Sequence, residues 1–176
     1  MRIMAKELSG NEDPLSPDNI VVYATGPLQG TGFGSSGRHC IATVSPKTKS
    51  VSDSYAGGFF AHDLALTGYD GIIIRGKATE PKYISLIEDD VSIKDASNLW
   101  GNTTYETEKQ IQKEDENIKV SSIGPAGENL VKFSCVMNDM GRATGRPGLG
   151  AVFGSKNLKA VVVKGAKEKQ YYDKDK

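Results

Sequence analysis

The chain has 176 residues, with 22 basic and 22 acidic side chains and 20 glycines. This length suits one domain, and the zero net charge gives no general attraction to nucleic acid or to an anionic membrane surface. No apolar run approaches the roughly 18 residues that span a bilayer, and residues 1–7 lack the apolar core of a signal peptide, so we expect a cytoplasmic protein without a membrane or nucleic-acid partner.

In the first half of the chain, the pattern predicts short strands around one helix. Runs of β-branched and other apolar residues bounded by turn residues are typical of strands. The expected strands are residues 19–25, 39–44, 71–75, 82–87 and 91–93. Residues 59–67 are expected to form a short helix that Gly68 ends, and the last two strands are expected to form a hairpin that turns at Asp89–Asp90.

The second half predicts a longer helix followed by further strands. The helix is expected over residues 103–116, with Thr103 or Thr104 as its N-cap. Strands are expected at residues 119–123, 130–136 and 160–164. Many strands, few helices and long ordered loops indicate an α+β fold, with a domain over residues 1–165 and a charged tail over residues 166–176.

An internal repeat relates the two halves. Residues 71–78 (GIIIRGKA) match residues 160–167 (AVVVKGAK) almost position for position, and a Gly-Pro pair follows an early strand in each half. Because the matches occur in the same order, we interpret them as a duplication, which predicts two packed sheets in two half-domains about a pseudo-twofold axis. It also predicts that Arg38 of one half lies opposite Arg142 of the other, an arrangement suited to a ligand with two similar anionic ends.

Glycine is concentrated in loops that carry arginine. The loops span residues 26–38, 57–58 and 141–150. The arginines in or beside them are Arg38, Arg142 and Arg146. Backbone N–H groups of glycine loops and forked guanidinium groups both bind phosphate, although the spacing matches neither a P-loop nor a dinucleotide-binding loop. The alternative for each arginine is a surface ion pair with a nearby acid.

The sequence shows no reaction centre. His39 is interpreted as a packed histidine in a strand, whereas His62 is a weaker candidate to reach the loop ligand. Cys40 and Cys135 are far apart and form no CxxC motif, so we expect two half-buried thiols and no metal cluster held by this chain. Three aspartates are interpreted as solvated surface acids, with the orientation of an arginine or a cation as the alternative: Asp53, Asp63 and Asp139.

Residues 141–152 (GRATGRPGLGAV) and 154–160 (GSKNLKA) are long and specific motifs. Together with other segments they resemble the N-terminal domain of the aldehyde ferredoxin oxidoreductases, the tungsten-pterin enzymes, over nearly the whole chain. The other segments are residues 13–19, 26–31, 37–38, 57–60, 68–72, 123–133 and 137–139.

This resemblance implies a base on which two pterin groups lie, which together chelate one tungsten or molybdenum and whose phosphates a magnesium ion bridges. The positions implied to bind this cofactor are Arg38, Tyr55, Gly57, Arg142, Ala143, Gly145 and Arg146. The backbone carbonyls of Tyr55 and Ala143 match the family's magnesium ligands, and a hard cation accepts carbonyl oxygen whatever the side chain. The chain departs from the family's common residues with Tyr55 in place of asparagine and with Ala61 and Pro147 in place of glycines.

The resemblance also implies an activity that this chain is not expected to complete alone. The complete enzyme would oxidise an aldehyde to a carboxylate and pass electrons to ferredoxin through a [4Fe–4S] cluster. The cysteine-bearing helical domains that hold the cluster and the family's opening strands are expected in another part of the protein or in a partner subunit. The exposed strand edge then predicts self-association into a homo-oligomer. The alternatives are a non-enzymatic module that binds pterin or another phosphate ligand, and a structural remnant with empty loops.

Overall fold

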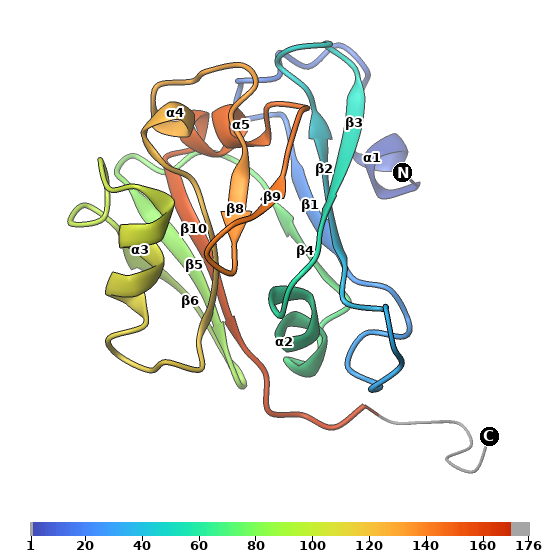
Figure 1. Ribbon diagram of the computed structural model, residues 1–176. Coiled ribbons are helices and arrows are strands. Elements are labelled where there is room, and N and C mark those ends of the chain that lie inside the picture. The colour runs from blue at the N-terminus through green and yellow to red at the C-terminus, as the bar shows by residue number, and fades with distance from the viewer. Residues whose placement is uncertain (1, 170–176) are drawn as a thin grey trace.

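The computed structural model describes residues 2–169, within which ten strands form two packed sheets (Figure 1). The four-stranded sheet has the order β3-β2-β1-β4 and consists of β1 (Val21–Ala24), β2 (His39–Val44), β3 (Val51–Ala56) and β4 (Gly71–Ile74). The six-stranded sheet has the order β6-β5-β10-β7-β8-β9 and consists of β5 (Lys82–Ile87), β6 (Asp90–Asp95), β7 (Lys119–Ser122), β8 (Val136–Asn138), β9 (Arg142–Thr144) and β10 (Leu158–Lys164). The mostly β, two-sheet fold expected from the sequence is confirmed.

Five short helices are found in the same part of the chain. They are α1 (Arg2–Glu7), α2 (Phe60–Leu66), α3 (Thr104–Ile111), α4 (Pro125–Glu128) and α5 (Leu149–Ser155). Thr103 caps α3 in a capping box, because its side chain accepts the Glu106 N–H while the Glu106 carboxylate accepts the Thr103 N–H at 2.9 Å. Gly68, with φ +90°, lies just past the end of α2, as expected. None of the helices in residues 2–169 is long and apolar enough to cross a bilayer.

The main core lies between the two sheets and includes side chains from α2 and α5. Tyr23 of β1 stands at its centre, with ring centroids 5.7 Å from Phe60 and 6.1 Å from Phe153. Two smaller apolar clusters cover the outer faces: Met4 of α1 packs with Val22 and Ala42, whereas Ile111 of α3 belongs to the cluster of Val120 and Val162. Each sheet is therefore covered by one helix on its outer face.

The strand register confirms the duplication. The order β3-β2-β1-β4 of the first half recurs as β9-β8-β7-β10 in the second half, with every neighbouring pair antiparallel. Val22 pairs with Ile73 in the first half, and Val120 pairs with Val162 in the second. The sequence match of residues 71–78 to 160–167 makes Ile73 the equivalent of Val162, so sequence and pairing agree.

The structure corrects several expected boundaries. The strand expected at residues 130–136 is wrong, because residues 130–135 form a turn-rich loop and β8 begins at Val136; Leu130 has φ +57°, which a strand excludes. The helix expected to reach residue 116 ends at Ile111. The segment expected to be a glycine loop over residues 141–150 contains β9 and the start of α5.

The expected tail lies mostly outside the described residues, which end at residue 169. Within the described part, the Lys167 N–H donates to the Leu66 carbonyl at 2.9 Å, so the chain still contacts the end of α2 after β10 ends. The domain boundary at residue 165 stays a prediction.

Candidate functional site

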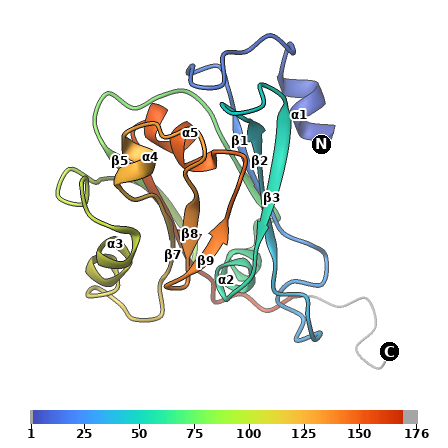
Figure 2. The same cartoon turned by 45° about the horizontal axis from the view of Figure 1, so that its top comes forward.

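The edge strands β3 and β9 of the two sheets lie against each other (Figure 2). The Gly145 N–H, just after β9, donates a 2.9 Å hydrogen bond to the Ser54 hydroxyl in β3. We call β3, β9 and the loops at residues 37–38, 57–58 and 145–148 the β3–β9 edge. This edge joins the two halves and contains all seven residues singled out from the sequence as cofactor-binding.

Tyr55 and Ala143 occupy equivalent positions in the two halves. Tyr55 of β3 pairs with Cys40 of β2, and Ala143 of β9 pairs with Met137 of β8. In both halves a glycine follows two residues after this position, Gly57 after Tyr55 and Gly145 after Ala143. Tyr55 and Ala143 are both exposed, so the edge presents two similar backbone segments side by side.

Among the residues that the structure describes, the three arginines of the edge are exposed and form no ion pair. Arg38 directly precedes β2, Arg142 begins β9, and Arg146 lies in the loop after β9. Within residues 2–169 none of them has a carboxylate partner or a hydrogen bond from its side chain, whereas Arg75 elsewhere is paired with Glu7. In the described part of the chain, the alternative of surface ion pairs is therefore wrong for these arginines.

Arg38 and Arg142 are not equivalent members of the repeat. The register of β8 with β9 makes Ser54 the equivalent of Arg142, and Cys135 the equivalent of Arg38. The expectation that the repeat itself sets one arginine opposite the other is therefore wrong. Arg38 reaches the edge from the start of β2, whereas Arg142 reaches it from β9, so the two halves contribute arginines from positions that are not equivalent.

Asp139, in the turn between β8 and β9, caps a helix of the other half. Its carboxylate accepts the N–H groups of Phe59 at 2.9 Å and Phe60 at 3.2 Å, at the start of α2. Gly58 has φ +102°, and a Cβ there would overlap this carboxylate. The interpretation of Asp139 as a solvated acid is wrong, because its negative charge is used at the positive end of α2.

A second contact runs in the opposite direction, from the turn between β2 and β3 in the first half to the loop after β9 in the second half. The Ser45 hydroxyl, just after β2, donates to the Pro147 carbonyl at 2.6 Å. Gly148 follows with φ +79°, where a Cβ would overlap the Lys132 carbonyl. Next to Arg38, the amide of buried Gln29 donates to the Arg38 carbonyl at 2.8 Å. These contacts fix the loops of the β3–β9 edge before any ligand binds.

His39 is packed in the core, as expected from its place in a strand. Its ring is fully buried, stacks on Tyr23 at 5.8 Å and lies 5.0 Å from Phe60. Neither ring nitrogen has a hydrogen-bond partner among the described residues, and burial lowers the pKa of His39 to about 4 although Asp139 opposes the shift. His39 is therefore neutral near pH 7, and its position directly after Arg38 anchors that residue to the core.

The remaining candidates are divided between the edge and the rest of the surface. The nearby Asp53 carboxylate, which favours the protonated phenol, raises the pKa of the exposed Tyr55 side chain to about 12. His62 is exposed on α2, 3.7 Å from Asp63, and its reach toward a ligand stays a prediction.

Cys40 and Cys135 are half-buried free thiols, as expected. In residues 2–169 no three His, Cys, Asp or Glu side chains are grouped to hold a metal.

Sequence reasoning did not find Ser54 in the edge or Asn138 in the adjacent β8 as site residues. The Asn138 amide donates to the Gly57 carbonyl at 3.0 Å, while its own carbonyl oxygen is buried without a partner among the described residues. Ser54 accepts the Gly145 N–H. Both contacts join segments about 80 to 90 residues apart, and neither residue type is distinctive in sequence, so no local signal identified them.

Comparison with known proteins identifies relatives over nearly the whole chain. Residues 1–165 match the family model of the aldehyde ferredoxin oxidoreductase N-terminal domain. The tungsten-containing aldehyde ferredoxin oxidoreductases of Pyrococcus furiosus and Thermococcus kodakarensis are 48% and 45% identical to it, and each match covers 99% of this chain and 29% of the relative. The aliphatic sulfonate oxidoreductase WOR-like subunit of Pyrococcus furiosus is 39% identical, over 93% of this chain and 28% of that protein.

A solved structure has the same fold. The active site complex BamBC of benzoyl coenzyme A reductase with 1,5-dienoyl-CoA superposes with a TM-score of 0.92 at 41% identity, covering 95% of this chain and 26% of that one. The chain thus spans less than a third of the length of these relatives.

Proposed function

The chain belongs to the aldehyde ferredoxin oxidoreductase family, and from this premise we propose that its β3–β9 edge binds a tungsten-pterin or molybdenum-pterin cofactor with two phosphate-bearing ends. The observation that carries the proposal is the equivalence of Tyr55 and Ala143. Two matching backbone segments, one from each half, lie side by side on strands that contact each other. A ligand with two similar ends meets two similar surfaces there.

The arginines supply the charge that such a ligand needs. Arg38, Arg142 and Arg146 have no acid to neutralise them within residues 2–169, so no ion pair must break when a phosphate arrives. Zero net charge over the chain is therefore compatible with a local positive site. The loops are held by Asp139 and Ser45, which lowers the entropy lost when a ligand binds.

We propose that a magnesium ion would be held at the same surface. Magnesium prefers oxygen ligands, and the backbone carbonyls of Tyr55 and Ala143 are the protein oxygens that we propose for it. Because a carbonyl is the ligand, tyrosine in place of the family's common asparagine is compatible with the site.

We assign this domain the binding, orientation and charge neutralisation of the cofactor. When bound, the metal-pterin group supplies the two-electron oxidation of an aldehyde to a carboxylate. The [4Fe–4S] cluster, the substrate pocket and the contact with ferredoxin are proposed for polypeptide beyond this domain or for a partner subunit, since the chain covers 29% of its relatives. Arg38 and Arg142 bind phosphate in this scheme, and His39 holds the strand beside Arg38 in place.

The test is cofactor retention in the complete assembly purified from its own source. Arg38→Ala and Arg142→Ala should each lower tungsten or molybdenum content, measured by mass spectrometry, and pterin content, measured by fluorescence, by about tenfold, because each removes a charged hydrogen-bond donor pair. Arg75→Ala is the matched control, since Arg75 is exposed but already paired with Glu7. Unchanged metal and pterin content in both edge variants would contradict the proposal.

The same material separates an oxidoreductase from a pterin-binding module without activity. We expect aldehyde-dependent reduction of ferredoxin by the assembly that retains metal and pterin. Full retention without any such reduction would favour the module, whereas an absence of both cofactor components from the wild-type assembly would leave a structural role.

A further inference from the structure

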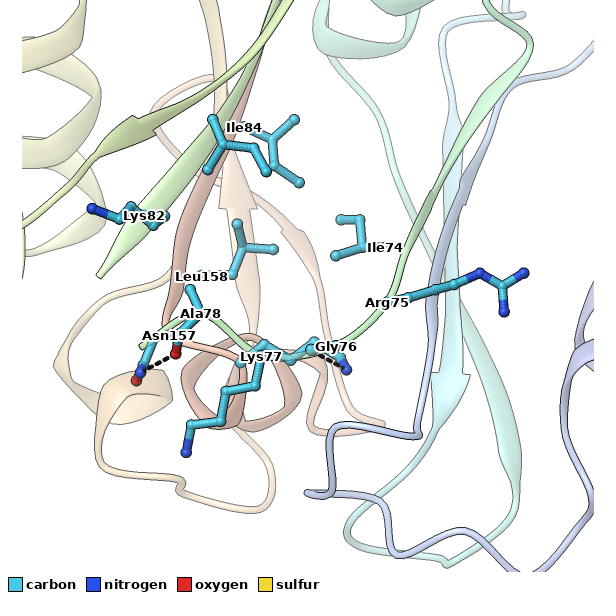
Figure 3. Close-up of a pocket in the computed structure, with 11 residues that line it drawn as sticks. Ile74, Arg75, Gly76, Lys77, Ala78, Lys82, Ile84, Asn157 and Leu158 are labelled. Carbon is cyan, nitrogen blue, oxygen red and sulfur yellow. Dashed lines mark hydrogen bonds between the residues drawn. The ribbon is translucent and has the colours of Figure 1, made fainter. Parts of the chain in front are cut away.

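The hairpin β5–β6 borders one cavity on each of its faces, because neighbouring residues of a strand point to opposite sides of a sheet. The cavity on the inner face, of about 280 Å³, is bordered by Ile84 and, on the opposite wall, by Ile74 (Figure 3). The cavity on the outer face, of about 330 Å³, lies between the hairpin and α3 and is lined mostly by polar side chains. Its volume is near the lower end of the range for ligand sites, and its polarity suits a small hydrophilic ligand.

Tyr83 of β5 brings a free hydroxyl group to the outer cavity. The residue is only 8% exposed, and its ring packs in the apolar cluster that includes Leu99 and Ile111. Its hydroxyl has no hydrogen-bond partner among residues 2–169, although buried hydroxyl groups are normally paired. Burial, and after it the charge of Glu114, raises the pKa of Tyr83, so this hydroxyl is protonated at neutral pH and can donate a hydrogen bond to a ligand.

Free polar groups of both charges surround this hydroxyl. They belong to Asn98, Gln110, Lys113 and Glu114. In the described part of the chain, Asn98, Lys113 and Glu114 form no hydrogen bond or ion pair with their side chains. Gln110 accepts the Asn102 side-chain amide at 3.2 Å, which leaves its own NH2 group free to donate. These four side chains therefore offer a ligand both donors and acceptors that the protein does not use.

A second polar cavity, of about 370 Å³, adjoins the first along one side of α3. Gln110 and Lys113 line both cavities, and Asn102, Glu106 and Lys109 complete the lining of the second. Residues 106, 109 and 110 lie on one face of α3 by their spacing, and residue 113 follows in the turn after the helix. We call the two cavities together the α3 groove, which has two adjacent places for hydrophilic groups.

We propose that the α3 groove binds a neutral disaccharide, with one sugar ring beside Tyr83 and the other beside Lys109. A hydroxyl group both donates and accepts hydrogen bonds, so sugar hydroxyls match the mixture of unused donors and acceptors in the groove. The C–H face of the first ring covers Leu99 and Ile111, the two apolar residues that line the first cavity. The inference does not depend on cofactor binding at the β3–β9 edge.

The charges of the groove favour a neutral ligand over an ion. Lys113 and Glu114 carry opposite charges, as do Lys109 and Glu106 in the second cavity. Asp95, which also lines the first cavity, is already in a 3.0 Å ion pair with a lysine of β5. A ligand with a net charge would therefore be attracted by one member of each pair and repelled by the other.

The probes are four neutral disaccharides that differ in their linkage: maltose, cellobiose, sucrose and trehalose. Titrated into the full chain, at least one should bind one to one in calorimetry and shift the NMR signals of amides 98–99 and 109–114. Glucose fills only one cavity and should bind about tenfold more weakly than that disaccharide. No shift of these amides with any of the four disaccharides would overturn the proposal. Free arginine that binds more tightly than every disaccharide would overturn it as well, because the groove would then select charged ligands.

Tyr83→Phe should weaken the binding of that disaccharide by about tenfold, because it removes the unpaired hydroxyl and keeps the ring. The variant should fold as the wild type does, since no described residue loses a hydrogen bond. Tyr105→Phe is the matched control, because Tyr105 on α3 is 50% exposed and lines neither cavity. Glu114→Gln should also weaken binding, since a charged acceptor forms the stronger hydrogen bond, whereas its control Glu116→Gln should not. If Tyr83→Phe and Glu114→Gln both bind as the wild type does, the proposed site is wrong.

Discussion

The Asp139 carboxylate lies 2.9 Å from the backbone N–H of Phe59, across the junction of the two halves. Asp139→Ala leaves the first N–H groups of α2 without this acceptor, so we expect the free energy of unfolding to fall by about 1–2 kcal/mol. Asp139→Asn keeps an acceptor oxygen and should lose less. Urea unfolding measures both, with Glu116→Ala as the exposed carboxylate control. Equal stability of Asp139→Ala and wild type would show that the contact contributes nothing.

Gly58→Ala tests the same junction from the other side. The new methyl group would overlap Asp139 at a residue with φ +102°, so we expect a loss of about 2 kcal/mol or more in the free energy of unfolding. Gly34→Ala is the control, because a Cβ at Gly34 meets open space. If both substitutions lower the free energy of unfolding by the same amount, the loss is a general effect of replacing glycine and does not come from the contact of Gly58 with Asp139. Thermal unfolding of the two variants decides the point.

His39 should make stability depend on pH. Its folded pKa of about 4 lies below the ordinary value of 6.5, so the unfolded chain binds more protons between these pH values and stability rises with pH across that window. The contribution of neutral His39 to the free energy of unfolding, about 3 kcal/mol, is fully present above pH 6.5 and is lost as the pH falls to about 4. Urea unfolding between pH 4 and pH 7 measures this slope.

His39→Phe should flatten that slope without a large loss of stability at pH 7, because neither ring nitrogen of His39 has a hydrogen-bond partner in the described part of the chain. His62→Gln, a change at the exposed histidine, should leave the slope in place. A slope that persists unchanged in His39→Phe would assign the pH dependence to other groups.

A buried ion pair joins α4 to the six-stranded sheet. The side chains of Lys159 and Glu128 are 0% and 5% exposed, and burial lowers the pKa of Lys159 while Glu128 opposes the shift. Glu128→Gln leaves the buried ammonium without its counter-charge, so we expect a loss of about 3 kcal/mol, which Lys159→Met in the same chain should largely recover. Asp115→Asn, which breaks the more exposed pair with Lys164, should cost less than about 1 kcal/mol. A double variant no more stable than Glu128→Gln alone would contradict this account.

The elements that the sequence predicted well have strong local signals. β2 was expected over residues 39–44 and has those bounds, because an apolar run ends at the turn Ser45–Pro46. The start of α3 follows from Thr103 and Glu106, which satisfy each other's backbone within one turn. The order of the duplicated strands followed from the repeat of residues 71–78 at 160–167.

The elements that were missed lack such signals. β3 (VSDSYA) is too polar for an apolar strand pattern, and its position is set by pairing with β2. α5 (LGAVFGS) is buried on all sides, so it shows no helical periodicity, and its glycines resemble a loop. At the site, the resemblance supplied Tyr55 and Ala143, whereas their equivalence required the strand register, and the role of Asp139 required a contact between residues 80 positions apart.

The exchange of contacts between turns and loops has a consequence for how the chain reaches its native state. Asp139 completes the loop of the first half, and Ser45 completes the loop of the second, over separations of 80 and 102 residues. Neither half can organise its loops before the other has formed its strands, so folding is dominated by distant contacts and should be slow and cooperative. A chain cut after Thr79 would yield two fragments that gain ordered structure only when mixed, each serving as the template on which the other folds.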